Sequence, residues 1–150
     1  VWRVDVGRIP LYLLDTNVVS ELRKVRAGKA DRHVAAWADS VDAADLYLSV
    51  IVVQELEIGV LLAERRDPSQ GAMLRAWLSG HVLPAFAGRI LDVDTAVAQR
   101  SARLHVPDPR PLRDGLIAAT ALVHGMTVVT RNVADFTPTA VPTFDPWVGR

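Results

Sequence analysis

The sequence predicts an α/β protein with a central, mostly parallel sheet of four to five strands. Short apolar segments alternate with longer segments of helical periodicity, a pattern that is typical of βαβ units. Helix-capping residues follow the first apolar segment directly, as expected where a strand leads into a helix. The chain has 150 residues and 50% of them are hydrophobic, which fits one domain with a sizeable core.

The first half of the chain predicts two strands and four helices. The apolar run at 11–14 is typical of a buried strand, and Asp15 begins a group of capping side chains for the next helix. Gly28 breaks the helical pattern, and Asp31 can cap the helix that follows. We expect, in order, a strand at 11–14, a helix at 18–24, a helix after Asp31, a strand at 46–50, and helices at 51–66 and 69–86.

The second half of the chain predicts the remaining strands. Three prolines stiffen the loop at 107–111, and the helix after it is rich in small residues, which allow close approach to a sheet. Gly125 is the expected C-cap of this helix. We expect a strand at 89–93, a helix from Asp94 through Leu104, a helix at 113–124, a strand at 126–130 and an edge strand at 141–144. Residues 1–10 fit no element, so we predict a flexible extension followed by a single domain at 11–150.

Charge and composition exclude several classes of protein. Lys and Arg number 17, as do Asp and Glu, so bulk electrostatics do not favour coating of nucleic acid, although an enzyme with a few local phosphate contacts stays possible. The absence of cysteine excludes disulfides, zinc–thiolate sites and thiol nucleophiles. No apolar run is long enough to cross a bilayer and no secretory signal is visible, so we expect a soluble, cytoplasmic protein.

Four acidic residues stand where the predicted topology brings them to one end of the sheet: Asp15, Glu55, Asp114 and Asp135. In open parallel sheets, sites lie beyond the carboxyl ends of the strands, at the point where the strand order reverses. Carboxylates gathered there repel each other unless a cation lies among them, and oxygen ligands suit Mg²⁺ or Mn²⁺. The pattern therefore predicts a metal-dependent phosphoryl-transfer enzyme.

Each of these acids also has a simpler explanation. Asp15 can serve only as a helix cap, Asp114 can interact with the dipole of its helix, and Asp135 can be a turn residue. Glu55 can face water or pair with an arginine, and its neighbour Glu57 competes for its place because the surrounding helix is apolar nearly all round. Four such coincidences in one chain are improbable, so the joint pattern favours a site. No Gly-rich phosphate loop, nucleophile elbow or histidine pair with ligand spacing offers another chemistry.

The acids lie in motifs that resemble a known family. In chain order the motifs are Leu-Leu-Asp15-Thr-Asn17, Gln54-Glu55-Leu56 with Gly59, Arg113-Asp114 before an alanine-rich helix, and Thr130-Arg131-Asn132 with Asp135-Phe136. From Leu11 to about Phe144 they resemble the PIN domain, and specifically the VapC toxins of toxin–antitoxin pairs. The resemblance implies a three-layer α/β/α sandwich and an endoribonuclease that depends on Mg²⁺ or Mn²⁺ and cuts structured RNA such as tRNA or rRNA.

The resemblance also assigns roles to residues. It implies a catalytic quartet of Asp15, Glu55, Asp114 and Asp135, in which Asp15 and Asp114 are the direct ligands of one or two metal ions and the other two are further candidates. It implies polar support from Asn17 and Thr130, a homodimer, and a cognate VapB-like antitoxin that reaches into the site with a basic side chain. From their positions beside two of the acids, Arg113 and Arg131 are candidates for holding RNA phosphates, with solvated surface arginines as the equal alternative.

Three other functions remain open at this stage. One is a PIN nuclease of RNA processing, and another is a catalytically degenerate PIN module that only binds RNA or protein. The third is a receiver-type regulator, which also gathers acids around Mg²⁺ but needs a lysine near a late strand. Both lysines of this chain, Lys24 and Lys29, come early, which disfavours it.

Overall fold

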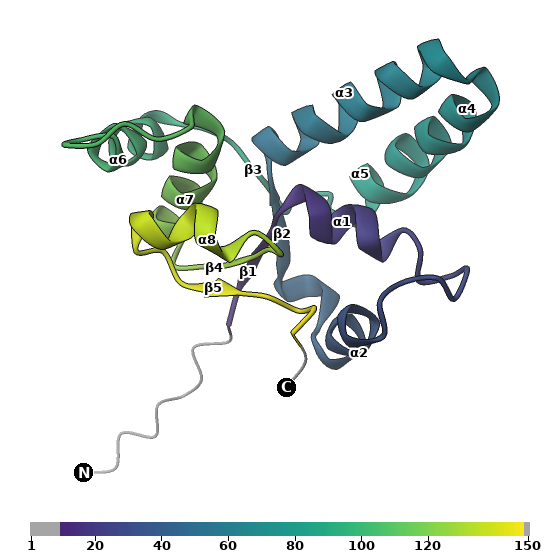
Figure 1. Ribbon diagram of the computed structural model, residues 1–150, viewed down its shortest axis with the longest axis horizontal. Coiled ribbons are helices and arrows are strands. Elements are labelled where there is room, and N and C mark those ends of the chain that lie inside the picture. Colours follow the sequence, from purple (N-terminus) through teal and green to yellow (C-terminus); the bar gives the residue numbers. More distant parts are fainter. Residues whose placement is uncertain (1–9, 149–150) are drawn as a thin grey trace.

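A five-stranded sheet runs through the middle of the molecule, with helices on both faces (Figure 1). The computed structural model describes residues 10–148. The predicted extension at 1–10 therefore lies outside the described residues except for Pro10. Among the described residues, no helix has the length and apolar character that a membrane span requires.

Every strand pairing in the sheet is parallel, and the strand order is β3-β2-β1-β4-β5. This confirms the predicted α/β class and its parallel sheet. The strands are β1 (Tyr12–Leu14), β2 (Leu46–Ser49), β3 (Ile90–Leu91), β4 (Thr127–Val129) and β5 (Thr143–Phe144). The chain adds strands on one side of β1 and then crosses to the other side, so the order reverses between β1 and β4.

Helices α1 and α2 lie on one side of the sheet, and α6 and α7 lie on the other (Figure 1). The helices are α1 (Thr16–Leu22), α2 (Arg32–Ser40), α3 (Val50–Arg66), α4 (Pro68–Trp77), α5 (Leu83–Ala85), α6 (Thr95–Leu104), α7 (Leu112–His124) and α8 (Val133–Phe136). Short 3₁₀ turns occupy η1 (Ala43–Asp45) and η3 (Thr137–Thr139), and a π-turn occupies η2 (Leu78–Val82).

Side chains predicted to cap helices do so. The Asp15, Asp31 and Asp94 carboxylates accept hydrogen bonds from the first turns of α1, α2 and α6. Gly125 ends α7 with a positive φ of 67°, a conformation that glycine adopts without strain. These helix boundaries follow from local chemistry, which explains why the sequence predicted them.

Several elements differ from the prediction, three of them most clearly. The helix expected at 69–86 is α4, η2 and α5, because a π-turn interrupts it. The strand expected at 89–93 pairs only at β3, with Leu48 beside Ile90 and Ser49 beside Leu91. The four-residue helix α8 was not predicted, because it is too short for a periodic pattern.

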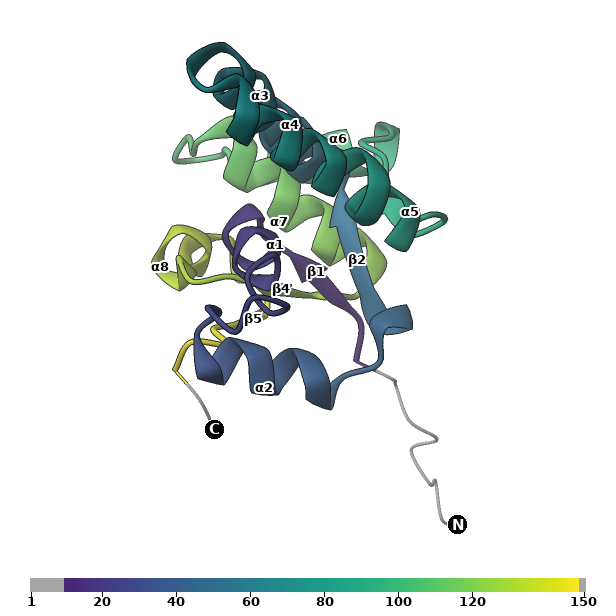
Figure 2. The same ribbon diagram turned by 90° about the vertical axis from the view of Figure 1, so that its right-hand side faces the viewer.

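Helices α3 and α4 form a hairpin that projects beyond the end of the sheet (Figures 1 and 2). They pack closely at Gly71, where an added Cβ would lie 2.4 Å from the Cα of Glu64. Only glycine fits at such a distance from another backbone. The hairpin therefore depends on a residue without a side chain.

Candidate active site

Asp15 lies at the point where the strand order reverses. Leu14 is in register with Val129, and the Asp15 backbone N–H donates to the Val129 carbonyl at 2.9 Å, so the residues that follow β1 and β4 emerge side by side. The Asp15 side chain is only 1% exposed. Its Oδ1 accepts from the Thr16 N–H at 2.8 Å, and its Oδ2 accepts from the Thr130 hydroxyl at 2.7 Å. A buried carboxylate is tolerated here because donors surround it.

Thr130 and Asn17 bind the same carboxylate and each other. The Asn17 side-chain amide lies 3.5 Å from Asp15 Oδ2 and 3.4 Å from the Thr130 hydroxyl. The Arg131 N–H donates to Asn17 Oδ1 at 3.2 Å, and the Asn132 N–H donates to Thr130 Oγ1 at 3.0 Å. The first turn of α1 is thus tied to the segment after β4, and the orientation of Asp15 is fixed from both sides.

Glu55 approaches this point from α3, which begins directly after β2 with Ser49 as its cap. The Thr16 hydroxyl donates to Glu55 Oε1 at 2.5 Å. Glu57 points elsewhere and pairs with Arg75 of α4 at 2.6 Å. Successive residues of a helix are about 100° apart, so the two glutamates lie about 200° apart around α3. They are on opposite sides of the row of buried residues along this helix, which we call its buried stripe. Sequence periodicity does not separate them, because it does not show which side of the stripe faces the sheet.

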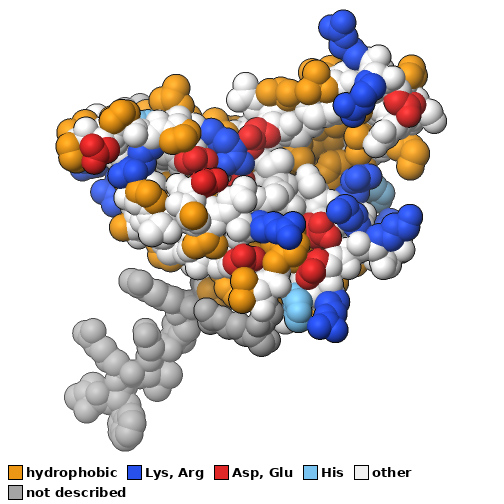
Figure 3. Space-filling model, viewed as in Figure 1, with side chains coloured by type: hydrophobic (Ala, Val, Ile, Leu, Met, Phe, Trp, Pro, Cys, Tyr) orange, Lys and Arg blue, Asp and Glu red, His pale blue; other side chains and the backbone are white. Residues whose placement is uncertain are grey.

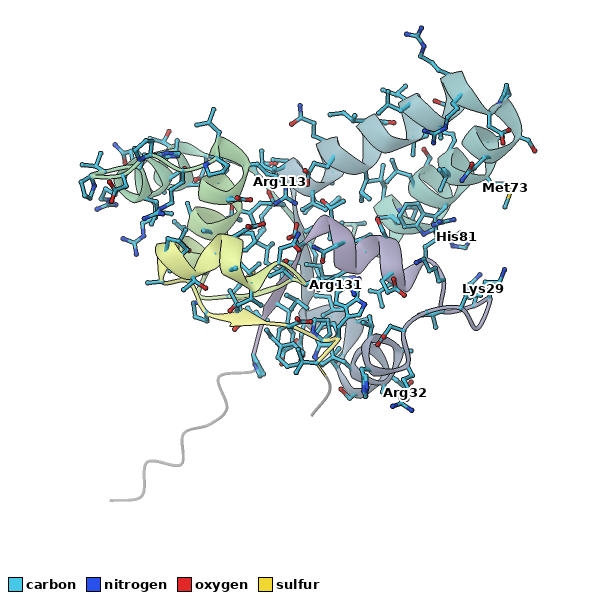
Figure 4. The ribbon with its side chains drawn as sticks, viewed as in Figure 1. Lys29, Arg32, Met73, His81, Arg113 and Arg131 are labelled. Atoms are coloured by element: carbon cyan, nitrogen blue, oxygen red, sulfur yellow. The ribbon has the colours of Figure 1, made fainter. Side chains whose placement is uncertain are left out.

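Asp114 enters from the first turn of α7, beside Arg113. The guanidinium of Arg113 reaches a different carboxylate with each of its nitrogens. Nη2 binds Asp15 Oδ1, Nε binds Glu55 Oε2 at 2.5 Å, and Nη1 binds Asp114 Oδ1 at 3.0 Å. We call these three acids and their arginine the Arg113 cluster. Figure 4 labels Arg113 in the centre of the molecule, and Figure 3 shows basic and acidic side chains in contact at that place.

The charges of the cluster stabilise each other. Burial alone raises the pKa of Glu55, but hydrogen bonds from Arg113 and Thr16 outweigh it and hold that pKa below its ordinary value. Burial alone lowers the pKa of Arg113, but its bonds to Glu55 and Asp15 prevail, so the pKa of the guanidinium lies above its ordinary value. The arginine is therefore a permanent cation among the acids.

Asp135 and Arg131 lie outside this cluster. Asp135 is on α8 and exposed, and within the described residues its carboxylate forms no hydrogen bond or ion pair. Helix α8 follows β4 and lies next to α7 (Figure 1), but the Asp135 carboxylate does not contact Arg113. The Arg131 guanidinium lies over the Trp147 ring, 5.1 Å from its centroid. The structure thus brings together three of the four predicted acids.

Comparison with known proteins identifies the family. The model of the PIN domain matches residues 12–137. This chain is a PIN-domain protein. It is 39% identical over 143 residues to Toxin FitB of Neisseria gonorrhoeae, an alignment that covers 91% of this chain and 99% of the relative. It is 38% identical over 142 residues to the VapC ribonuclease Y4jK of Sinorhizobium fredii, covering 91% and 98%.

A solved structure has a similar fold. The crystal structure of FitAcB from Neisseria gonorrhoeae superposes with a TM-score of 0.82 at 39% identity, and covers 91% of this chain and 99% of the compared chain. The predicted sandwich fold and family are confirmed by these similarities. The roles of individual site residues stay predictions.

The donor set of this PIN domain fits a hard divalent cation. Asp15, Glu55 and Asp114 all come within reach of a single guanidinium, and carboxylate oxygens are the ligands that Mg²⁺ and Mn²⁺ prefer. As they stand, no three acidic or histidine side chains among the described residues are arranged to hold a metal ion directly. The Arg113 guanidinium lies among the three carboxylates instead.

Two contacts of the site were missed at the sequence level. Thr16 donates to Glu55, and its place between Asp15 and Asn17 was the only signal available. The sequence predicts Arg113 as a phosphate contact and not as the partner of three acids. Such a contact joins residues 98 and 58 positions apart, so no local pattern reports it.

Proposed function

We propose that this PIN-domain protein is a metal-dependent endoribonuclease that acts as the toxin of a toxin–antitoxin pair. The single observation that carries the proposal is that Asp15 after β1, Glu55 of α3 and Asp114 of α7 all meet the same guanidinium, that of Arg113. The relatives named Toxin FitB and VapC ribonuclease, which align over nearly their whole length, support the choice of activity.

Each residue of the proposed site has its own role. Asp15 and Asp114 would hold Mg²⁺ or Mn²⁺, with Glu55 and Asp135 as further ligands of one or two ions. When bound, the ion supplies Lewis acidity at a phosphate oxygen and lowers the pKa of a water molecule that attacks phosphorus. Thr130 and Asn17 keep Asp15 oriented, because they hydrogen-bond the oxygen that does not face Arg113. Arg131 is a candidate for holding a flanking RNA phosphate.

A cleavage assay tests this function. We expect the purified chain to cut structured RNA when Mg²⁺ or Mn²⁺ is present and to stop when EDTA is added. Asp114→Asn should abolish cleavage and leave the fold intact by circular dichroism. Wild-type activity in a folded Asp114→Asn protein, or full activity in EDTA, would refute the proposed roles and would favour a different chemistry. A folded wild-type protein that binds RNA without cutting it would favour the degenerate module.

We further propose that this protein binds a cognate antitoxin. An apolar hollow of about 270 Å³ lies between α1 and the α4–α5 stretch, and Arg23, Arg26 and His81 contribute basic groups to its lining. Its apolar wall is formed by Val19, Leu22, Trp77, Val82, Ala85 and Phe86. A cognate antitoxin with an apolar, acidic segment suits this surface. We expect the product of a small neighbouring gene to co-purify with the toxin, which also forms a homodimer measurable by light scattering.

The partner and the nuclease site can be tested separately. Trp77→Glu places a charge in the hollow and should abolish co-purification, whereas Asp114→Asn should retain it. A neighbouring product that binds Trp77→Glu as well as the wild type would place the partner elsewhere. If no such partner exists and the RNA cleavage persists, an RNA-processing PIN nuclease becomes the better description.

A further inference from the structure

One basic side chain neutralises the acids that the proposed function reserves for a metal. Arg113 uses all three of its nitrogens on Asp15, Glu55 and Asp114. The acids come from the end of β1, from α3 and from α7, so the guanidinium joins three separate parts of the fold. Bonds between charged groups are roughly twice as strong as neutral ones. These contacts are therefore a substantial part of what holds the cluster together.

A guanidinium and a metal ion cannot hold these acids in the same way. Mg²⁺ binds carboxylate oxygens at about 2.0–2.1 Å and demands that they converge on one point. Arg113 instead donates to each carboxylate from a different nitrogen of a flat group, with contacts of 2.5 Å to Glu55 and 3.0 Å to Asp114. This spreads the acids around the guanidinium, in agreement with the lack of a ready metal cage among the described residues.

We infer that Arg113 is a built-in competitor for the metal, which occupies the acid cluster and must leave it before the ion can bind. The inference rests on the proposed metal-dependent function and adds a condition to it. The Arg113 side chain is 32% exposed, so its guanidinium can turn toward solvent while α7 stays in place. Once displaced, it remains beside the site as a free cation for an RNA phosphate.

The opposite role for Arg113 makes the opposite prediction. If the arginine only positions the carboxylates for the ion, its removal disorders them and weakens metal binding. If it competes with the ion, its removal leaves acids that repel each other and bind the ion more tightly. The sign of the change in metal affinity therefore decides between the two roles.

Isothermal titration of the full chain with Mn²⁺, without RNA, measures that sign. We expect Arg113→Gln to bind Mn²⁺ at least about tenfold more tightly than the wild type, because a charge-assisted competitor is gone. Arg113→Lys should fall between the two, since an ammonium cannot span three carboxylates. Arg75→Gln is the matched control: it removes the same charge from a side chain that is also 32% exposed, outside the Arg113 cluster, and should leave the affinity unchanged. If Arg113→Gln does not fold, Arg113→Lys supplies the comparison.

Nuclear magnetic resonance follows the displacement in the wild-type protein. The Nε–H signal of Arg113 should shift and lose its protection from solvent exchange as Mg²⁺ is added, because its bond to Glu55 breaks. The Nε–H of Arg110, which donates to the Leu104 carbonyl at 3.0 Å, is an internal reference that should not move. A signal of Arg113 that keeps its bond in the metal-loaded protein would overturn the inference.

The outcomes separate this inference from the proposed function. Equal or weaker Mn²⁺ binding by Arg113→Gln, with measurable binding by the wild type, overturns the competitor and leaves the metal-dependent nuclease standing. Metal binding that appears only in Arg113→Gln supports the competitor directly. Failure of the wild type and every variant to bind Mn²⁺ overturns the proposed metal-dependent function and the competitor with it.

Discussion

Two arginines of this protein have the same exposure and very different surroundings. The side chains of Arg75 and Arg113 are each 32% exposed, and each binds more than one carboxylate. Arg75 pairs with Glu57 at 2.6 Å and with Glu64 at 3.2 Å, both on the neighbouring helix α3. Their side chains are 42% and 37% exposed. Arg113 pairs with acids from three elements, of which Asp15 is 1% and Asp114 is 11% exposed.

The difference shows that the role of an arginine in an ion pair depends on the burial and the hydrogen bonds of its partner carboxylates. The carboxylates around Arg75 are exposed, so water can replace the arginine at little cost. Around Arg113, Asp15 is buried and held by Thr130 and Asn17, and Glu55 is held by Thr16. Asp15 and Glu55 therefore keep neutral donors when the arginine leaves, whereas among the described residues the Asp114 carboxylate has only Arg113. We therefore regard Arg75 as part of a surface ion pair and Arg113 as part of the site.

The largest expected contrast is in RNA cleavage. Asp15→Asn should lower the cleavage rate by at least about 10²-fold, the range seen when one preorganised charge-stabilising group is removed. Glu57→Gln, which loosens only the Arg75 pair, should cleave at the wild-type rate. Asp135→Asn should fall between them, because Asp135 is exposed and outside the Arg113 cluster. If folded Asp15→Asn and Glu57→Gln proteins lost equal amounts of cleavage rate, the conclusion that Arg75 and Arg113 have different roles would be wrong.

The next contrast concerns what holds α3 against α4. Gly71→Ala should lower the free energy of unfolding by about 1–3 kcal/mol, because the new methyl group meets the Glu64 backbone and forces the helices apart. Gly59→Ala, where an added Cβ meets nothing within 4 Å, is the control and should not destabilise the protein. Urea denaturation measures both. A neutral Gly71→Ala would mean that the hairpin can open without loss, and that the Arg75 ion pairs matter more than we conclude.

Removing each arginine compares the two regions directly. Without metal, Arg113→Gln should lower the free energy of unfolding by about 1–2 kcal/mol, because it leaves three carboxylates without their common cation. Arg75→Gln should leave the urea midpoint nearly unchanged, since its partners are exposed. A larger loss for Arg75→Gln than for Arg113→Gln would reverse the comparison.

The smallest expected effect is on how the free energy of unfolding changes at acidic pH. The pKa of Glu55 lies below its ordinary value, so its charged form stabilises the fold at neutral pH, and this contribution disappears as pH falls through the folded pKa. Wild type should therefore be more stable than Glu55→Gln near pH 7, and the two should converge in acid. Glu57→Gln should show the same sign, because hydrogen bonding to Arg75 lowers the pKa of Glu57, but a smaller difference, since its side chain is more exposed. Urea denaturation across pH measures the difference, and a Glu55→Gln gap that stays constant into acid would contradict it.

Much of the fold was predictable because it follows from neighbours along the chain. Capping by Asp15, Asp31 and Asp94 and the left-handed turn at Gly125 need only residues within one helical turn. The alternation of apolar strands and periodic helices then implied a parallel sheet with Asp15 and Thr130 at its carboxyl end. Helix α8 was not predictable in this way, because four residues show no period.

The tertiary structure alone decided which charged groups meet. The choice of Glu55 over Glu57 depends on the rotation of α3 against the sheet, and the pairing of Glu57 with Arg75 depends on the return of α4. The position of Arg113 among three acids, and of Asp135 outside them, depends on how α7 and α8 pack beside the paired strands β1 and β4. The sequence by itself determined the acids and the elements that carry them, since these are local properties. Their mutual distances arise only when packing fixes the angles between distant elements.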